Sequence, residues 1–153
     1  MISQNKSDKD KEGSENMNFA GRFFHGIDPK NRVFVPAEFR EDLGENFYIY
    51  KSPEKCLCLY NQERWDELVE LVKNRTTSND ERNIKRKFFS RVAPCKMDKQ
   101  GRITISAEFL GFASIENEVA FAGMGNCVEL WNVDAWRAIE ESDDDDDLEG
   151  IMF

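Results

Sequence analysis

The sequence predicts an α+β protein in which two copies of one strand-rich unit interlock, because the chain repeats itself. The segment Asp28-Pro-Lys-Asn-Arg32-Val-Phe-Val-Pro-Ala-Glu-Phe39 returns as Asp98-Lys-Gln-Gly-Arg102-Ile-Thr-Ile-Ser-Ala-Glu-Phe109. Further along, Cys56-Leu-Cys-Leu-Tyr60 has its counterpart in Cys127-Val-Glu-Leu-Trp131, and a Trp-containing helical pattern follows each copy. Two copies in one chain indicate a pseudo-dimer with two equivalent sites.

The first copy begins with a strand, a turn and a second strand. Residues 19–27 are rich in aromatic side chains and predict a strand, whereas Asp-Pro-Lys-Asn at 28–31 predicts a turn. The alternating segment 32–35 then predicts the returning strand of a hairpin. Pro36 suits the first turn of a short helix, which Gly44 ends.

Two strands and a longer helix complete the first copy. Residues 46–51 and 56–60 are the strand segments, and 62–74 predicts an amphipathic helix with apolar side chains at i, i+3, i+4 and i+7. After a break at 76–79, residues 80–89 predict a basic helix. Its cations either line DNA, contact a neighbouring subunit or form an ordinary solvated face.

The second copy predicts the same order of elements: a strand ending at Met97, a turn at 98–101, a strand at 102–105, a short helix at 107–112, strands at 117–123 and 127–131, and a helix at 133–141. A single copy has few strands and an exposed edge, so it cannot easily bury both faces of its sheet alone. The two copies should therefore interlock.

Charge and composition divide the chain further. Residues 1–17 are polar and without periodicity, and they predict a disordered arm. Most of the net charge of −9 comes from the eight acidic residues after position 137, so 142–153 predicts a disordered acidic tail. Between them lie the first repeat at 18–75, a linker with the basic helix at 76–90, and the second repeat at 91–141.

The same sequence argues against several functional classes. It has no apolar run long enough for a membrane span and no signal peptide, so we expect a cytoplasmic protein without a membrane partner. It has no glycine motif for phosphates, so we expect no cofactor and no small-molecule substrate. His25 is the single histidine, which argues against an enzyme and leaves no catalytic residue to name. Cys56-x-Cys58 without a nearby histidine predicts no metal site.

The two turns carry the candidate chemistry. Each has the pattern Asp-x-x-x-Arg, with Asp28 and Arg32 in the first copy and Asp98 and Arg102 in the second. Arginine offers a fork of donors that matches phosphate oxygens or the O6/N7 edge of guanine, and a two-stranded ribbon fits the major groove of DNA. The turns therefore indicate either binding of double-stranded DNA or, more simply, intrachain ion pairs that stiffen each turn.

These paired turns, the Ala-Glu-Phe that follows each and the Trp-bearing helix after each copy resemble the MraZ family of bacterial transcriptional regulators. The resemblance spans residues 18–137. It implies two interlocked AbrB-like swapped-hairpin repeats (a double-split β-barrel) related by a pseudo-twofold axis, with flanking helices and assembly into ring-shaped homo-oligomers. It also implies binding to repeated promoter sites in the nucleoid, with repression of the division and cell-wall gene cluster as the usual outcome.

Carried over by position, the resemblance assigns DNA contacts to Arg32 and Arg102, phosphate contacts to Lys30 and Lys99, and support of the binding face to Arg40. The turn-setting residues are Asp28, Asp98, Asn31 and Gly101. Leu110 stands in the second copy where the first has Arg40, so we expect the second copy to be the weaker DNA reader.

An alternative function is an antitoxin-like or scaffolding module, in which the same barrel binds a protein partner. A tightly copurifying protein and no salt-dependent affinity for DNA would distinguish this function from DNA regulation. Both alternatives use the fold as a binding scaffold.

Overall fold

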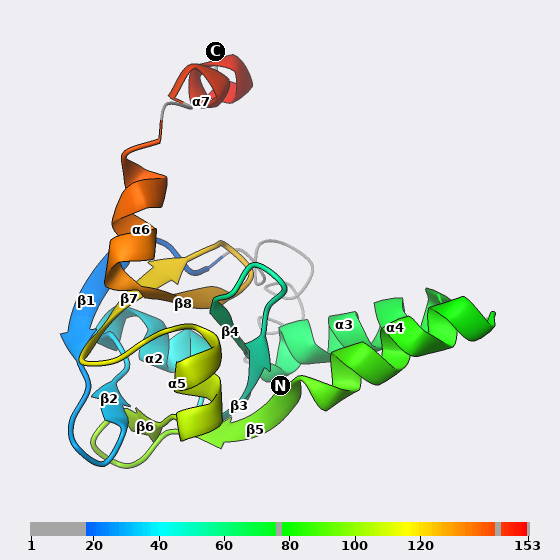
Figure 1. The fold of residues 1–153 in the computed structure, drawn as a ribbon, viewed down its shortest axis with the longest axis horizontal. Coiled ribbons are helices and arrows are strands. Elements are labelled where there is room, and N and C mark those ends of the chain that lie inside the picture. The colour runs from blue at the N-terminus through cyan, green and yellow to red at the C-terminus, as the bar shows by residue number, and fades with distance from the viewer. Residues whose placement is uncertain (1–17, 76–77, 143–144, 153) are drawn as a thin grey trace, which may run out of the picture.

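A computed structural model of the chain describes residues 18–75, 78–142 and 145–152, and the predicted disordered arm at 1–17 lies outside them. The first half forms β1 (Arg22–Gly26), β2 (Arg32–Phe34), α2 (Ala37–Leu43), β3 (Asn46–Lys51), β4 (Leu57–Tyr60) and α3 (Gln62–Arg75). The second half forms α4 (Asn79–Ser90), β5 (Val92–Lys96), β6 (Arg102–Thr104), α5 (Ala107–Phe112), β7 (Glu118–Gly123), β8 (Val128–Asn132), α6 (Val133–Glu140) and α7 (Asp145–Met152). Figure 1 shows a body of strands and short helices from which α3 and α4 extend together.

The strands form one large sheet and one small ribbon. The large sheet is antiparallel and has the order β1-β7-β8-β4-β3-β5, while β2 and β6 pair as a separate two-stranded ribbon. β1, β3 and β4 of the first repeat correspond to β5, β7 and β8 of the second. If each strand is replaced by its counterpart, the strand order is the same read from the opposite edge, so the sheet has a pseudo-twofold symmetry. The first strand of each repeat thus pairs with the third strand of the other repeat, and each repeat completes its sheet with a strand from its partner.

One sequence-based prediction is wrong, because the strands that flank each Asp-x-x-x-Arg turn do not pair as a hairpin. β1 lies in the large sheet against β7, whereas β2 lies in the ribbon against β6. Alternating side chains identify a strand but do not say which strand it pairs with. Here Val33 of β2 pairs with Ile103 of β6, and both side chains are buried.

The main core lies between the large sheet, the ribbon and the short helices α2 and α5. Val33 and Ile103 face it from the ribbon, and Phe39 enters it from α2. The Phe39 ring is 1% exposed and meets the rings of Phe19 and Phe23 edge-on, with centroid distances of 5.8 and 5.4 Å. The ribbon is therefore fixed by its inner side chains, which leaves its outer side chains free to serve another purpose.

The opposite face of the large sheet carries a second, smaller cluster. It holds Cys56, Cys58, Tyr60 and Cys127, with Trp65 and Leu68 of α3 packed against them. Trp65 stacks on Tyr48 at 4.4 Å between ring centroids and on Phe88 of α4 at 5.6 Å. Trp65 therefore packs α3 and α4 against this face of the sheet.

The acidic tail also departs from the prediction of disorder, because Asp145–Met152 forms helix α7. Acidic side chains at the beginning of a helix favour its dipole, and Leu148, Ile151 and Met152 recur at helical spacing. These three apolar side chains are exposed, and α7 projects away from the body (Figure 1). Across the described ranges, no helix combines the length and the hydropathy that a membrane crossing requires.

Candidate nucleic-acid interface

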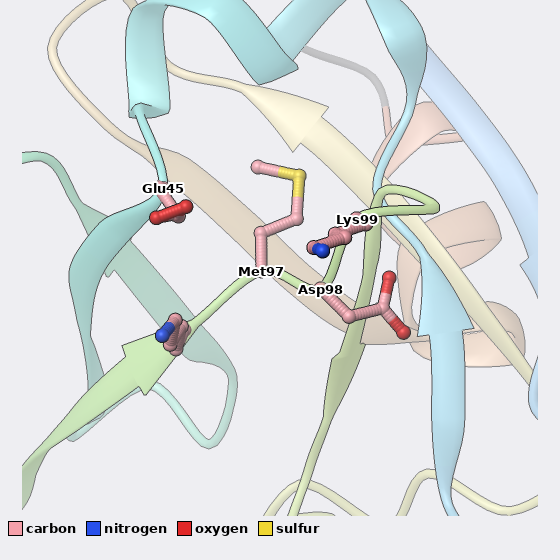
Figure 2. A pocket seen from close by; sticks show the side chains of 5 residues that line it. Glu45, Met97, Asp98 and Lys99 are labelled. Atoms are coloured by element: carbon pink, nitrogen blue, oxygen red, sulfur yellow. The ribbon is translucent and has the colours of Figure 1, made fainter.

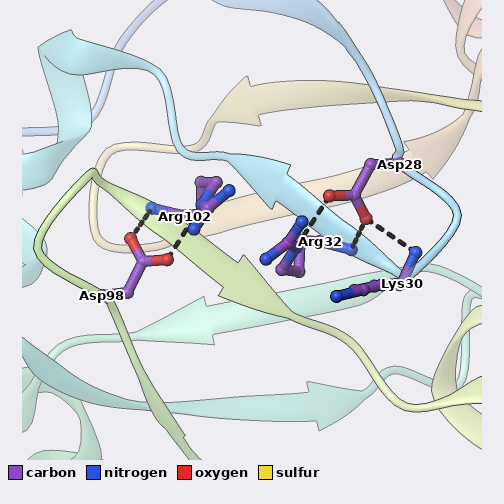
Figure 3. Close-up of polar contacts among 5 residues, drawn as sticks. All are labelled: Asp28, Lys30, Arg32, Asp98 and Arg102. Atoms are coloured by element: carbon purple, nitrogen blue, oxygen red, sulfur yellow. Dashed lines mark hydrogen bonds and ion pairs between the residues drawn. The ribbon is translucent and has the colours of Figure 1, made fainter.

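The first Asp-x-x-x-Arg turn is built around the carboxylate of Asp28. Its Oδ1 accepts hydrogen bonds from the backbone N–H groups of Lys30 at 2.9 Å and Arg32 at 2.8 Å. Its Oδ2 accepts a third bond from Nε of Arg32 at 2.7 Å, which makes the contact an ion pair (Figure 3). Asn31 closes the turn by donating its N–H to the Asp28 carbonyl, with a φ of 62° that asparagine tolerates better than most residues.

The second turn repeats this geometry. Asp98 accepts from the backbone N–H groups of Gln100 and Arg102, each at 2.9 Å, and from Nε of Arg102 at 2.9 Å (Figure 3). Gly101 takes the place of Asn31 with a φ of 88°. The intrachain ion pairs that one interpretation of the turns predicted are therefore present in both copies.

Both turn carboxylates have a pKa below the ordinary aspartate value. For Asp28 the largest cause is the hydrogen bond from the backbone N–H of Arg32; the Arg32 side chain and the Lys30 N–H lower the pKa further, and burial opposes them. The pKa of Asp98 is lowered in the same way by Arg102 and Gln100. The ionised carboxylate is therefore the form that holds each turn.

This shift predicts that the stability advantage of the wild type over Asp28→Asn disappears in acid. Because the folded-state pKa lies below 3.8, the contribution is fully present above pH 3.8 and is lost as the pH falls through the folded-state pKa. Urea unfolding of both proteins should give different midpoints near neutral pH and converging midpoints below pH 3.8. A difference that stays constant over the whole range would contradict a role for the ionised carboxylate.

The two arginines share the outer face of the ribbon. Arg32 pairs with Thr104 and Arg102 pairs with Phe34, and side chains at directly paired positions point to the same face of a sheet. Val33 and Ile103, between them, point inward to the core. Figure 3 shows the two arginines side by side on neighbouring strands, each beside its own aspartate.

Each guanidinium keeps donors available on this face. The side chains of Arg32 and Arg102 are 32% and 23% exposed, and both bind their aspartate through Nε. Within the described part of the chain, their terminal Nη groups have no hydrogen-bond partner. The ion pairs orient the arginines without using the donors that a bidentate contact needs, so the two interpretations of the turns are compatible.

Sequence reasoning missed Phe34 as a member of this face. Its side chain is 47% exposed, which is unusual for a phenylalanine, and the Arg102 guanidinium lies 5.8 Å from its ring centroid. The signal was present in the alternation, since Phe34 lies two residues after Arg32. This exposed aromatic ring beside Arg102 adds an apolar contact surface to the outer face of the ribbon.

The tips of both turns are cationic at their edges. Lys30 and Lys99 are exposed, one in each turn. A hollow beside the second turn is lined by Glu45, Lys96, Met97, Asp98 and Lys99 (Figure 2). The negative charges of its carboxylates and the positive charges of its ammonium groups cancel, so the hollow favours neither anions nor cations. Lys99 is relevant to the interface as an exposed cation.

Arg40, expected to support the binding face, reaches from α2 to the turn of the other repeat. Its Nε donates to the Val35 carbonyl at 2.8 Å, and its guanidinium lies against Gly101 in the turn of the other repeat. A Cβ atom at Gly101 would lie only 2.5 Å from Cζ of Arg40. Arg40 therefore braces the second turn, so the arginine that the second repeat lacks is supplied to its turn by the first repeat.

The same contact explains why the two turns differ in sequence. The second turn combines glycine with an arginine packed over it, whereas the first has Asn31 at a φ of 62°, and Leu110, the counterpart of Arg40, is buried. Sequence comparison showed both differences, but only the exchange of strands between repeats links Arg40 to Gly101.

Replacing Gly101 by alanine should destabilise the protein by about 1–3 kcal/mol, because a Cβ is strained at positive φ and would also displace Arg40. Chemical unfolding measures this loss. Asn31→Gly is the matched control at the equivalent position and should change stability by less than about 1 kcal/mol. Equal stability of Gly101→Ala and the wild type would contradict the packing described for Arg40.

The fold and the turns define a class of two-repeat α+β proteins that display paired arginines on a β-ribbon. Comparison with known proteins agrees with this division into repeats. The family described as "MraZ protein, putative antitoxin-like" matches residues 18–87 and again residues 88–150.

Three relatives carry the name "Transcriptional regulator MraZ". The protein from Carboxydothermus hydrogenoformans is 39% identical over 120 residues, which cover 78% of this chain and 84% of the relative. The protein from Heliobacterium modesticaldum is 41% identical over 124 residues, covering 80% and 87%. The protein from Caldanaerobacter subterraneus is 38% identical over 125 residues, covering 81% and 87%. The chain belongs to the MraZ family, as the paired motifs predicted.

Proposed function

We propose that this protein is a transcriptional regulator that binds promoter DNA with the outer face of the β2–β6 ribbon. The observation that carries the proposal is the placement of Arg32 and Arg102 on one face, partly exposed and oriented by their own aspartates. The names of the relatives support a role in transcription.

The proposed contacts follow from the chemistry of the face. A two-stranded ribbon fits the major groove, where a guanidinium can bind O6 and N7 of guanine in a bidentate manner. Lys30 and Lys99, at the turn tips, are placed to contact phosphates, and Arg40 acts indirectly by bracing the second turn. The two contacts are related by the pseudo-twofold of the strand order, which suits a site with two similar half-sites.

We further propose that the body is a pair of AbrB-like swapped-hairpin repeats (a double-split β-barrel) and that several chains form a ring. The exchange of β1 and β5 between repeats supports the first part, and family membership supports both. On the same basis we propose a nucleoid location and repression of the division and cell-wall gene cluster.

Selection of bound sequences from random duplex DNA, with the full-length protein at two salt concentrations, tests the function. We expect enrichment of a short repeated motif at both concentrations and an affinity that falls as salt increases, because phosphate contacts release counterions. Failure to enrich any sequence at either concentration would contradict sequence-specific DNA binding.

A second candidate is an antitoxin-like or scaffolding module that binds a protein. The observation that favours it is the α3–α4 pair, where Leu71, Ile84 and Phe89 are exposed among basic side chains. Affinity purification with Ile84→Glu as the control variant separates the candidates. A stoichiometric protein partner that depends on Ile84, together with a failed DNA selection, would favour this module over the regulator.

A further inference from the structure

The smaller cluster on the outer face of the large sheet holds a set of metal-ligating side chains drawn from both repeats. Cys58 of β4 and Cys56 directly before that strand come from the first repeat, and Glu129 of β8 and Cys127 directly before it occupy the equivalent positions of the second repeat. β4 and β8 are neighbours at the centre of the sheet, and Cys58 pairs directly with Glu129. Because side chains two residues apart share a face, all four lie on the same side of these strands.

Three of the four donor atoms of this set are close together. The Sγ atoms of Cys56 and Cys58 and a carboxylate oxygen of Glu129 all lie within 4.8 Å of one another. Cys127 packs in the same buried cluster, beside the three donors that lie within this distance of one another. Around a tetrahedral zinc ion with Zn–S bonds of about 2.3 Å, neighbouring donors lie roughly 3.5–3.8 Å apart. Small side-chain rotations would therefore bring these donors onto one ion.

Burial and charge favour a cation at this position. Cys56, Cys58, Cys127 and Glu129 are 0%, 5%, 8% and 8% exposed. The Glu129 carboxylate accepts one hydrogen bond, from Nε1 of Trp131 at 2.9 Å, and among the described residues no basic side chain forms an ion pair with it. A buried carboxylate without a cation is costly, and a metal ion supplies the missing positive charge.

Arg64 of α3 adds a second positive group at the edge of the cluster. Its Nη1 pairs with Glu67 at 3.1 Å, its buried Nε has no partner among the described residues, and its charge also favours the thiolate of Cys127. Three thiolates and a carboxylate carry more negative charge than one divalent ion neutralises. A guanidinium beside the sulfurs offsets part of the remainder, as cationic neighbours do for thiolates elsewhere.

We propose that Cys56, Cys58, Cys127 and Glu129 bind one zinc ion in a closed tetrahedral site between the two repeats. Three sulfurs and one carboxylate oxygen suit zinc, whereas magnesium and calcium prefer oxygen donors alone. With four protein ligands and no open position, the site is structural, and the ion holds β4 to β8 where the repeats meet.

Sequence spacing did not reveal this site because each repeat supplies only half of it. Cys56-x-Cys58 lacks a histidine, and Cys127-x-Glu129 resembles no metal motif. Only the pairing of β4 with β8 brings the halves together. The proposed site thus differs from the sequence-based expectation of no metal site, which the metal-binding test below addresses.

The test uses the full-length protein, purified with a reductant, and loaded separately with zinc chloride and cobalt chloride. Elemental analysis after desalting measures bound zinc, and the cobalt form reports thiolate ligation through charge-transfer and ligand-field absorption. The variants are Cys58→Ser and Glu129→Gln, and Cys95→Ser is the control because Cys95 is buried outside the cluster.

We expect about one zinc ion per chain in the wild type and in Cys95→Ser, with tetrahedral thiolate bands in the cobalt forms. Cys58→Ser should retain no stoichiometric metal. Glu129→Gln keeps an acceptor for Trp131 and should fold, yet bind zinc about tenfold or more weakly in competition with a chelator. The readout is metal content, so it does not depend on DNA binding.

Three outcomes would overturn the site. The first is a wild-type protein that retains no zinc and gives no thiolate bands with cobalt. The second is binding that survives unchanged in both Cys58→Ser and Glu129→Gln, since the metal would then lie elsewhere. The third is a disulfide between Cys58 and Cys127 in the reduced preparation, found by mass spectrometry, which would assign these sulfurs to redox chemistry.

Discussion

Replacing both Arg32 and Arg102 by alanine is expected to abolish specific DNA binding while the protein keeps its fold and its state of assembly. Each arginine that contacts a base edge contributes about 1–3 kcal/mol of discrimination, so the loss of both removes most of the preference for the correct site. The inner side of the ribbon is untouched, because Val33 and Ile103 remain in the core. Gel shifts with selected and scrambled DNA measure the affinity, and size-exclusion chromatography with circular dichroism checks the structure.

Two further variants sharpen this experiment. Arg22→Ala removes an arginine of β1, which lies in the large sheet and pairs with Glu140 of α6 at 2.6 Å. Because Arg22 is not part of the ribbon, this variant should leave the DNA affinity unchanged. Lys30→Ala should weaken binding to all sequences alike and reduce the salt slope by about one. If the double variant binds the selected site as tightly as Arg22→Ala does, the ribbon is not the reading surface.

The largest loss of stability is expected for Phe39→Ala. The side chain is 1% exposed and its ring meets Phe19 and Phe23, so truncation removes buried area and leaves a cavity between elements that cannot easily collapse. We expect a loss of about 3–5 kcal/mol in the free energy of unfolding. Urea unfolding followed by tryptophan fluorescence measures it.

Phe109 provides the matched control for this prediction. It holds the equivalent position of the second repeat but is only partly buried, where it packs against the core from α5. Phe109→Ala should therefore cost clearly less than Phe39→Ala. Equal losses of unfolding free energy in the two variants would mean that Phe109 contributes as much to the core as Phe39, although it is less buried.

The order of elements could be predicted from the sequence because local signals specify it. The Asp28 turn forms as its residues indicated, the helix expected at 62–74 is α3, and the helix expected at 80–89 is α4 with Ser78 and Glu81 as a capping box. Each of these features depends on residues within a few positions of one another. The candidate binding residues were named for the same reason, because the Asp-x-x-x-Arg pattern is local and occurs twice.

The pairing of elements could not be predicted in the same way. Nothing within residues 22–26 indicates that β1 pairs with β7 and not with its neighbour β2. The contact between Arg40 and Gly101, and the meeting of Cys58 with Glu129, follow from that pairing and were hidden for the same reason. α7 was missed for a different reason, since a run of five aspartates at 143–147 concealed the helical spacing of the apolar residues around it.

The exchange of edge strands has a consequence for synthesis of the chain on the ribosome. β1 leaves the exit tunnel well before its partner β7, and β2 must likewise wait for β6. Contacts between segments so distant in the chain delay folding. The nascent amino-terminal half therefore presents unpaired strand edges until the second half emerges, and such edges are prone to aggregation during that interval.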